Sequence, residues 1–172
     1  MEVVGEAGDG DEAIRVVRKL APDVVLMDVN MPGMGGIEAT RRLLRLAPST
    51  KVIAVTVLDD DPFPARLNEA GAVGYLTKGC PAREMIEAVR TVHRGVPYVA
   101  SAVARKHMLA DWKGVAASPF EELSAREMQV AMMILDGQRT QDISEALSLS
   151  PKTVSTYRQR IYDKLHVRTD VD

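Results

Sequence analysis

Short apolar runs alternate with amphipathic segments along the first half of the chain. Runs rich in β-branched residues predict strands at residues 3–7, 23–28, 51–56 and 74–77. Apolar positions spaced three and four apart predict helices at residues 11–20, 37–47, 64–70 and 82–93. Strands and helices that alternate in this way are typical of a parallel sheet joined by crossover helices. We therefore predict that this half is an α/β domain.

The run at residues 24–27 is apolar at every position, so we expect both faces of that strand to be covered. Loops with Pro and Gly follow two of the predicted strands, at residues 31–36 and 78–81. In parallel sheets, chemistry gathers at the carboxyl ends of the strands. These loops are therefore the first place to look for functional residues.

After residue 97 the pattern changes to helices only. We expect a helix at residues 101–112 within a connector, and a stretch of Gly, Ala, Ser and Pro at residues 113–119 separates it from the C-terminal helices. Ser124 is a candidate N-cap, and Glu127 is its capping-box partner. That helix is expected to end near Gly137.

Two further helices are predicted at residues 141–147 and 151–165, joined by a tight turn at residues 148–150. Pro151 fits the first turn of the last helix, where its missing N–H costs nothing. A short turn between two helices is the arrangement of a helix-turn-helix.

Composition narrows the class of protein. The chain has 172 residues, of which 46% are hydrophobic and 27% charged, and this mixture is typical of a soluble folded protein. No apolar run reaches the roughly 18 to 20 residues that cross a bilayer, so we expect a cytoplasmic protein without a membrane partner. One Cys and three scattered His residues exclude an internal disulfide and argue against a zinc site of the Cys/His kind.

The charge is uneven although the formal net charge is only −2. Residues 150–168 contain five basic residues and a single acidic one, Asp163. A basic segment in an acidic chain is typical of a nucleic-acid-binding surface.

Three polar side chains end or directly follow three predicted strands: Asp28, Thr56 and Lys78. A carboxylate can act as a nucleophile toward a phosphoryl group, while a hydroxyl and an ammonium can hold the phosphoryl oxygens. The alternative is structural: Asp28 caps a helix, Thr56 is an ordinary strand residue and Lys78 is a solvated loop charge. Their common position at one edge of the sheet favours an aspartyl-phosphate site.

The segments around these residues resemble the receiver domain of two-component response regulators. The resemblance is carried by Val24-Val25-Leu26-Met27-Asp28-Val29-Asn30-Met31-Pro32-Gly33, Ala54-Val55-Thr56 and Ala70-Gly71-Ala72-Val73-Gly74-Tyr75-Leu76-Thr77-Lys78-Gly79. It implies that a sensor histidine kinase phosphorylates Asp28, that Thr56 and Lys78 bind the phosphoryl group, and that Mg²⁺ completes the site. Tyr75 matches the family's aromatic switch position, although a plain strand Tyr is the alternative.

The pattern departs from this family at its start. Family members begin with a further strand and helix, and that strand ends in two acidic residues that hold the metal. Nothing before Glu2 supplies this unit. Asp9 and Asp11 match a later loop, where we expect them to cap the following helix, so no metal ligand beyond Asp28 is assigned. Because the absent strand is central in the family's sheet, we expect the natural protein to carry about 25 more N-terminal residues.

The last helix has two distinct faces at about 100° per residue. The predicted buried stripe contains Val154, Tyr157, Ile161 and Leu165. The opposite face contains Lys152, Ser155, Thr156, Gln159, Arg160 and Asp163. These donors and acceptors suit base edges and phosphates, whereas the alternative is an ordinary solvated face.

This half resembles the LuxR-type helix-turn-helix of the NarL/FixJ family, through Leu123-Ser124-Ala125-Arg126-Glu127, residues 143–154 and Ile161-Tyr162-Asp163-Lys164-Leu165. Matching positions imply that Ser155, Thr156 and Gln159 face bases. Lys152, Thr153, Arg158 and Arg160 are phosphate candidates. Residues 61–64 and 150–158 are similar to the GacA/UvrY branch of the family. A fourth, dimerising helix begins in the family where residues 170–172 stand, so we expect both ends to be clipped.

The whole pattern predicts a flavodoxin-like receiver domain lacking its first βα unit at residues 1–97, a linker with a helix at 98–118, and an incomplete helix-turn-helix domain at 119–172. The implied protein is a transcription regulator, not an enzyme, that binds double-stranded DNA as a homodimer when phosphorylated on Asp28, with RNA polymerase as a further partner. One alternative is a phosphorylation-independent DNA-binding protein with a degenerate receiver. Another is an enzyme of flavodoxin-like fold, for which Gly33, Gly35 and Gly36 are too weakly patterned as a phosphate-binding loop.

Overall fold

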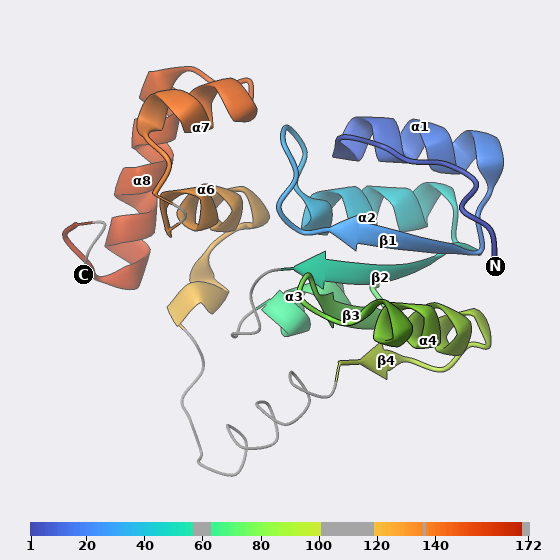
Figure 1. The fold of residues 1–172 in the computed structure, drawn as a ribbon. Coiled ribbons are helices and arrows are strands. Elements are labelled where there is room, and N and C mark those ends of the chain that lie inside the picture. The colour runs from blue at the N-terminus through green and yellow to red at the C-terminus, as the bar shows by residue number, and fades with distance from the viewer. Residues whose placement is uncertain (57–62, 101–118, 136, 170–172) are drawn as a thin grey trace, which may run out of the picture.

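The computed structural model describes residues 1–56, 63–100, 119–135 and 137–169. Its α/β part contains α1 (Gly10–Leu20), β1 (Val24–Asp28), α2 (Gly36–Leu46), β2 (Lys51–Thr56), α3 (Phe63–Glu69), β3 (Gly74–Thr77), α4 (Ala82–His93) and β4 (Tyr98–Val99) (Figure 1). Its helical part contains the 3₁₀ helix η1 (Pro119–Glu122), α6 (Ala125–Leu135), α7 (Thr140–Ala146) and α8 (Pro151–Leu165). Within these ranges, no helix is long and apolar enough to cross a membrane.

The strands form one four-stranded parallel sheet in the order β1-β2-β3-β4. Neighbouring residues of a strand point to opposite faces, and the neighbours Val52 and Ile53 of β2 belong to different clusters. Val52 packs with Met27 and with Leu43 of α2, whereas Ile53 belongs to a cluster that includes Val92 of α4. The helices α2 and α4 therefore cover opposite faces. Because all strands are parallel, their carboxyl ends lie at one edge of the sheet.

The strand predicted at residues 3–7 is wrong. The structure gives this segment no regular secondary structure, and Val3 and Val4 are exposed. The segment runs close to α1 instead, where a β-carbon at Gly5 would lie 2.8 Å from the side chain of Leu20. A β-branched run forms a strand only where a neighbouring strand accepts its hydrogen bonds, and no described strand pairs with this one.

The expectation that the strand at residues 24–27 is covered on both faces is also wrong for one of the two faces. Met27 is buried, but Leu26 is 42% exposed. The strand β1 lies at the end of the strand order, so it has a sheet neighbour on one side only among the described residues. Apolar character alone does not reveal how many elements surround a strand.

The other predicted elements are confirmed within the described ranges. In the α/β part, the bounds of the remaining predicted strands and helices differ from the prediction by at most one residue, and the same holds for α7. The elements β4 and η1 were not predicted, because runs this short show no period. The helix predicted at residues 101–112 lies outside the described residues.

The helical part has a buried centre that is continuous with a core cluster of the sheet domain. Met128 of α6, Ile143 of α7, and Val154 and Ile161 of α8 are buried and share one cluster. The stripe predicted on the last helix is confirmed, since the remaining members, Tyr157 and Leu165, pack partly buried against that cluster. The helix α8 contacts both α6 and α7.

Glu127 connects α6 to α8. The predicted capping box is confirmed: the Ser124 N–H donates to Oε2 of Glu127 at 2.7 Å, and the Glu127 N–H donates to Oγ of Ser124 at 3.3 Å. Lys164 of α8 also donates its ammonium to Glu127 Oε2, at 2.7 Å. Burial raises the pKa of Glu127, but the hydrogen bonds from Lys164 and Ser124 outweigh it and hold the pKa below its ordinary value of 4.5.

Acid is expected to destabilise the helical part below pH 4.5. Because the folded pKa of Glu127 is lowered, its contribution to stability is present above the unfolded pKa and is lost as pH falls through the folded pKa. Thermal unfolding from neutral to acidic pH measures this loss. Glu127→Gln should flatten that part of the profile and lower neutral-pH stability by about 1 to 3 kcal/mol. Exposed Glu145→Gln is the control, and an unchanged profile for Glu127→Gln contradicts the prediction.

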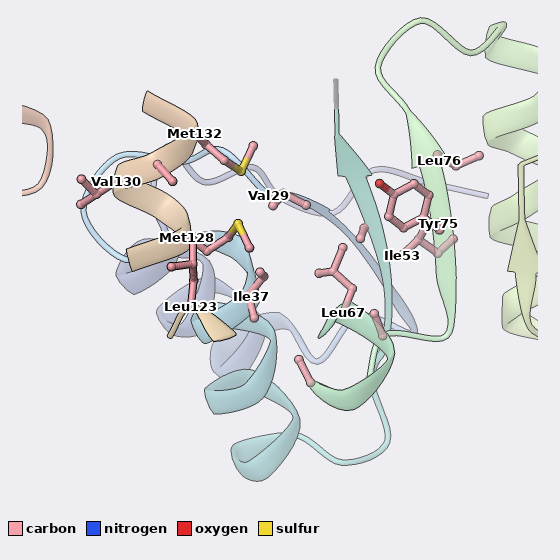
Figure 2. Packing of buried hydrophobic residues seen from close by; sticks show 14 of the residues in the cluster. Val29, Ile37, Ile53, Leu67, Tyr75, Leu76, Leu123, Met128, Val130 and Met132 are labelled. Atoms are coloured by element: carbon pink, nitrogen blue, oxygen red, sulfur yellow. The ribbon is translucent and has the colours of Figure 1, made fainter. Parts of the chain in front are cut away.

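The two parts share a continuous apolar contact. Figure 2 shows Met128 and Met132 of α6 directed toward Val29 and Ile37, which follow β1 and begin α2. All four side chains are buried and belong to the same cluster. A second contact is polar: Arg66 of α3 donates to the carbonyl oxygen of Phe120 in η1 at 3.0 Å. The helical part is therefore docked on the sheet domain next to the loop that follows β1.

Candidate functional site

Asp28, Thr56 and Lys78 lie at the carboxyl edge of the sheet. Asp28 ends β1, Thr56 ends β2 and Lys78 follows β3. The strand β2 runs between the other two, with Asp28 opposite Val55 and Thr56 opposite Thr77. Lys78 Nζ lies 2.7 Å from Oδ2 of Asp28. The structure thus brings the carboxylate and the ammonium together, as the strand-end positions predict.

The Asp28 carboxylate is accessible and polarised. Its side chain is 33% exposed and that of Lys78 is 41% exposed. Oδ1 accepts a hydrogen bond from the N–H of Asn30 at 2.9 Å. An ion pair this exposed contributes only about 0 to 1 kcal/mol, so Lys78 can move from the carboxylate to a new anion at little cost. A solvent-accessible carboxylate beside a mobile cation can act as a nucleophile toward a phosphoryl group.

Thr56 and Tyr75 are buried. The Thr56 carbonyl accepts the N–H of Lys78 at 2.7 Å, which fixes the start of the loop after β3. Tyr75 is 3% exposed and belongs to the main buried cluster, with its ring on the opposite face of the sheet from the side chains of Ile53 and Leu76 (Figure 2). The ring of Tyr75 is therefore in an inward position in this structure.

The donor set around Asp28 does not fit Mg²⁺. This ion prefers about six oxygen ligands in octahedral geometry, with one or two carboxylates and several waters. Both oxygens of the Asp28 carboxylate already have partners, the Asn30 N–H at 2.9 Å and the Lys78 ammonium at 2.7 Å, so neither faces an ion in this arrangement. Asp9 caps α1 by accepting the Glu12 N–H at 2.8 Å, as predicted. We derive no step from a metal.

The predicted DNA-facing side chains lie on the outer side of α8. The exposed ones are Lys152, Ser155, Thr156, Gln159 and Arg160. Thr153 and Arg158, two of the phosphate candidates, are partly buried instead. Thr153 hydrogen-bonds through its N–H to Oγ of the N-cap residue Ser150 at 3.1 Å, and Arg158 donates to the Tyr162 hydroxyl at 3.2 Å. In Figure 1, α6 lies between α8 and the sheet domain, so the sheet domain does not cover α8.

Arg126 and Gln129 of α6 hold the loop between β1 and α2 against the helix-turn-helix. The Arg126 guanidinium donates to the carbonyl oxygens of Gly33 at 2.7 Å and Leu147 at 3.0 Å. It also donates to Gln129 Oε1 at 2.7 Å. Gln129 in turn donates from Nε2 to the carbonyl oxygen of Met31 at 3.1 Å. We call these two side chains and their carbonyl partners the Arg126 clamp.

A backbone hydrogen bond also joins the loop between β1 and α2 to the helix-turn-helix. The Gly33 N–H donates to the carbonyl oxygen of Ala146, the last residue of α7, at 2.8 Å. Gly33 has φ +67°, a conformation that glycine adopts without strain. Burial lowers the pKa of Arg126, which nonetheless stays charged. A cleft of about 520 Å³ lies beside the clamp, lined from both parts of the chain.

Sequence patterns do not identify Arg126 and Gln129 as functional residues. They stand three apart on one helix, which predicts only that they share a face. Their main partners are carbonyl oxygens of a loop about 95 residues earlier, and carbonyls carry no sequence signature. A pattern could therefore have suggested the pair but not its target.

Gly36 allows α2 to begin directly beneath the site. A β-carbon there would overlap the carbonyl oxygen of Asp28 and would lie 2.8 Å from Cα of Val29. Both neighbours are backbone atoms that cannot turn away. We expect Gly36→Ala to lower the free energy of unfolding by about 2 to 3 kcal/mol, as measured by chemical denaturation.

Gly79→Ala is the control for Gly36→Ala. A β-carbon at Gly79 meets nothing within 4 Å, so this change should leave stability within about 1 kcal/mol of the original. Equal stability of the two variants would contradict the packing argument at Gly36.

Comparisons with known proteins identify the family of each part of the chain. Residues 1–90 match the family model for the response regulator receiver domain, and residues 121–172 match that for bacterial regulatory proteins of the luxR family. The chain is 52% identical to the response regulator GacA of Pseudomonas viridiflava, over 100% of this chain and 81% of that protein. It is 46% identical to the response regulator UvrY of Escherichia coli (strain K12), over 100% of this chain and 79% of that protein.

Solved structures show the same architecture. A LuxR-family two-component response regulator from Aurantimonas is 36% identical with a TM-score of 0.58, over 60% of this chain and 74% of that one. RcsB from Salmonella enterica serovar Typhimurium, bound to a promoter in the presence of the phosphomimetic BeF₃⁻, is 24% identical with a TM-score of 0.69. That match covers 99% of this chain and 82% of the RcsB chain, and it bears on the fold alone.

Proposed function

Since this chain belongs to the two-component response regulators that join a receiver domain to a LuxR-type DNA-binding domain, we propose that phosphorylation of Asp28 controls its binding to DNA. It is a DNA-binding transcription regulator of the GacA/UvrY type. The observation that carries the proposal is the 2.7 Å contact between Asp28 and Lys78 at the carboxyl edge of the sheet.

A sensor histidine kinase is the proposed phosphodonor. A carboxylate oxygen of Asp28 attacks the phosphorus of the kinase phosphohistidine, so that a P–O bond forms and the P–N bond breaks. The electron pair of the broken bond stays on the imidazole nitrogen, which takes a proton from solvent. The new group brings a charge of about −1.5 to −2 and strong acceptor oxygens, which Lys78 and Thr56 hold. In this role the protein acts by switching rather than by turnover of a substrate.

The Arg126 clamp is the proposed route from Asp28 to the DNA-binding helices. Asp28 Oδ1 accepts the Asn30 N–H, and Gly33 of the same loop binds both Arg126 and α7. A phosphoryl group on Asp28 changes the first of these contacts, which shifts the loop. The shift reaches the turn between α7 and α8 because Arg126 also binds the Leu147 carbonyl oxygen.

DNA binding is assigned to the outer side of α8. Ser155, Thr156 and Gln159 face base edges, and Lys152, Thr153, Arg158 and Arg160 contact phosphates. The active form is a homodimer in the cytoplasm that works with RNA polymerase. Residues 1–97 form the receiver, 98–118 the linker and 119–172 the DNA-binding domain.

Covalent labelling tests the phosphoacceptor. We expect the full chain to gain the mass of one phosphoryl group after incubation with acetyl phosphate, and borohydride reduction to place it on Asp28. Asp23→Asn is the matched control, because Asp23 is an exposed carboxylate beside the other end of β1, and it should label like the original. A chain that is folded but never labelled contradicts the proposal.

A second candidate function is phosphorylation-independent DNA binding with a degenerate receiver. It is favoured by one observation: among the described residues, no group of three or more His, Cys, Asp or Glu side chains is placed to hold a metal. This candidate predicts the same DNA affinity with and without a phosphodonor, whereas the first candidate predicts two different affinities.

A further inference from the structure

We propose that Asp163 is a positioning residue that fixes the orientation in which the side-chain amide of Gln159 meets a base pair. This inference rests on the proposed function, because it takes the outer side of α8 as the surface that enters the DNA groove. It assigns a role to the one carboxylate of that helix, which the DNA-binding assignment leaves unused.

The two side chains are joined on the exposed side of α8. Gln159 Nε2 donates to Asp163 Oδ1 at 2.9 Å, one helical turn further along. The neighbouring cation Lys164 is engaged elsewhere, since its ammonium binds Glu127 on α6. Asp163 is therefore available to Gln159, and both side chains are exposed.

The carboxylate selects one of the two orientations of the amide. An ionised carboxylate only accepts hydrogen bonds, so the amide nitrogen of Gln159 turns toward Asp163 and Oε1 turns away. The amide has two N–H groups, and only one is used in this contact. The second N–H and Oε1 remain for the paired contact that glutamine makes with N7 and N6 of adenine. Asp163 thus fixes the orientation of the Gln159 amide before the protein binds DNA.

The other base-facing side chains are held differently. The Ser155 hydroxyl donates to the carbonyl oxygen of Pro151, and the Thr156 hydroxyl donates to that of Lys152, each at 3.0 Å. Their hydrogens point back to the helix in the free protein. Gln159 keeps both a donor and an acceptor for DNA, so the fixed orientation of its amide matters most for the choice of base.

Asp163 has a second effect of opposite sign. Its negative charge lies on a surface that approaches phosphates, so it weakens binding to every DNA sequence. Removing the charge should strengthen general affinity, whereas removing the acceptor should weaken discrimination between bases. Two variants separate these effects: Asp163→Asn keeps an acceptor oxygen without the charge, and Asp163→Ala loses both.

The experiment measures Kd of the full chain for a duplex selected by that chain from a random-sequence pool, and for duplexes with single base pairs changed. Discrimination is the Kd for the changed duplex divided by the Kd for the selected duplex. At the base pair that Gln159 contacts, this ratio should fall about threefold to tenfold in Asp163→Ala. Asp163→Asn should keep the ratio within about twofold. Both variants should bind an unrelated duplex about two- to fivefold more tightly at low salt.

Gln159→Ala identifies the base pair that Gln159 contacts. It also distinguishes failure of the role of Asp163 from failure of the role of Gln159. If Gln159→Ala lowers a ratio while Asp163→Ala changes none, the role of Asp163 is overturned and the DNA-facing surface stands. If Asp163→Asn loses as much discrimination as Asp163→Ala, positioning through the acceptor oxygen is overturned. If Gln159→Ala changes no ratio, the base-facing role of Gln159 in the proposed function is overturned together with this inference.

Discussion

Replacing Asp28 with Asn is expected to abolish the change in DNA affinity that a phosphodonor produces in the unaltered chain. A side-chain amide cannot form the acyl phosphate. It still accepts the Asn30 N–H through Oδ1, so the loop after β1 keeps its contact. The variant loses only the exposed ion pair with Lys78, which costs about 0 to 1 kcal/mol. The loss of response is therefore not a loss of fold.

The measurement is Kd for a selected duplex with and without acetyl phosphate. We expect a change of about fivefold or more in the unaltered chain and less than about twofold in Asp28→Asn. Asp23→Asn, which removes an exposed carboxylate beside the same strand, should respond like the unaltered chain. A full response in Asp28→Asn would show that the acceptor is another residue.

The second large effect is expected from Arg126→Lys, which should separate phosphorylation from the DNA response. The guanidinium reaches the carbonyl oxygens of Gly33 and Leu147 at once, from two nitrogens of one rigid plane. A lysine ammonium cannot reproduce both directions, and losing one charge-assisted bond costs about 1.5 to 3 kcal/mol. Asp28 is unchanged in this variant, so acetyl phosphate should still label it completely. Labelling should nonetheless change the DNA affinity of Arg126→Lys by less than about twofold.

Amide hydrogen exchange gives Arg126→Lys an independent readout. Peptides covering residues 31–36 and 146–150 should exchange faster than in the unaltered chain, because the clamp holds both segments. Arg41→Lys is the matched control: Arg41 pairs only with Glu38 of its own helix in the described contacts, at 3.3 Å. If Arg126→Lys retains the full phosphodonor response, the clamp does not carry the signal.

The candidate phosphoacceptor site could be predicted because strand ends are visible in the sequence. Asp28, Thr56 and Lys78 each stand where an apolar run stops, and parallel strands place such residues at one edge whatever the details of packing. The face of α8 could be predicted for a similar reason, since the period of a helix decides which side is buried.

Contacts between distant segments could not be predicted in this way. Residues 3–7 have strand composition, but a strand also needs a partner, and composition does not reveal one. In the sequence, Arg126 is indistinguishable from an ordinary helix residue. Only the structure shows that it binds the carbonyl oxygens of Gly33 and Leu147. Likewise, the Asp163 carboxylate looks like a solvated charge until its contact with Gln159 is seen.

The most direct test of the phosphorylation switch is the Kd of the full chain for one selected duplex at fixed salt, in three states. These are the unphosphorylated chain, the chain after complete labelling verified by intact mass, and the same sample after the acyl phosphate has hydrolysed. We expect a change of about fivefold or more on labelling that reverses on hydrolysis. The same Kd in all three states would contradict control by Asp28 and favour phosphorylation-independent DNA binding.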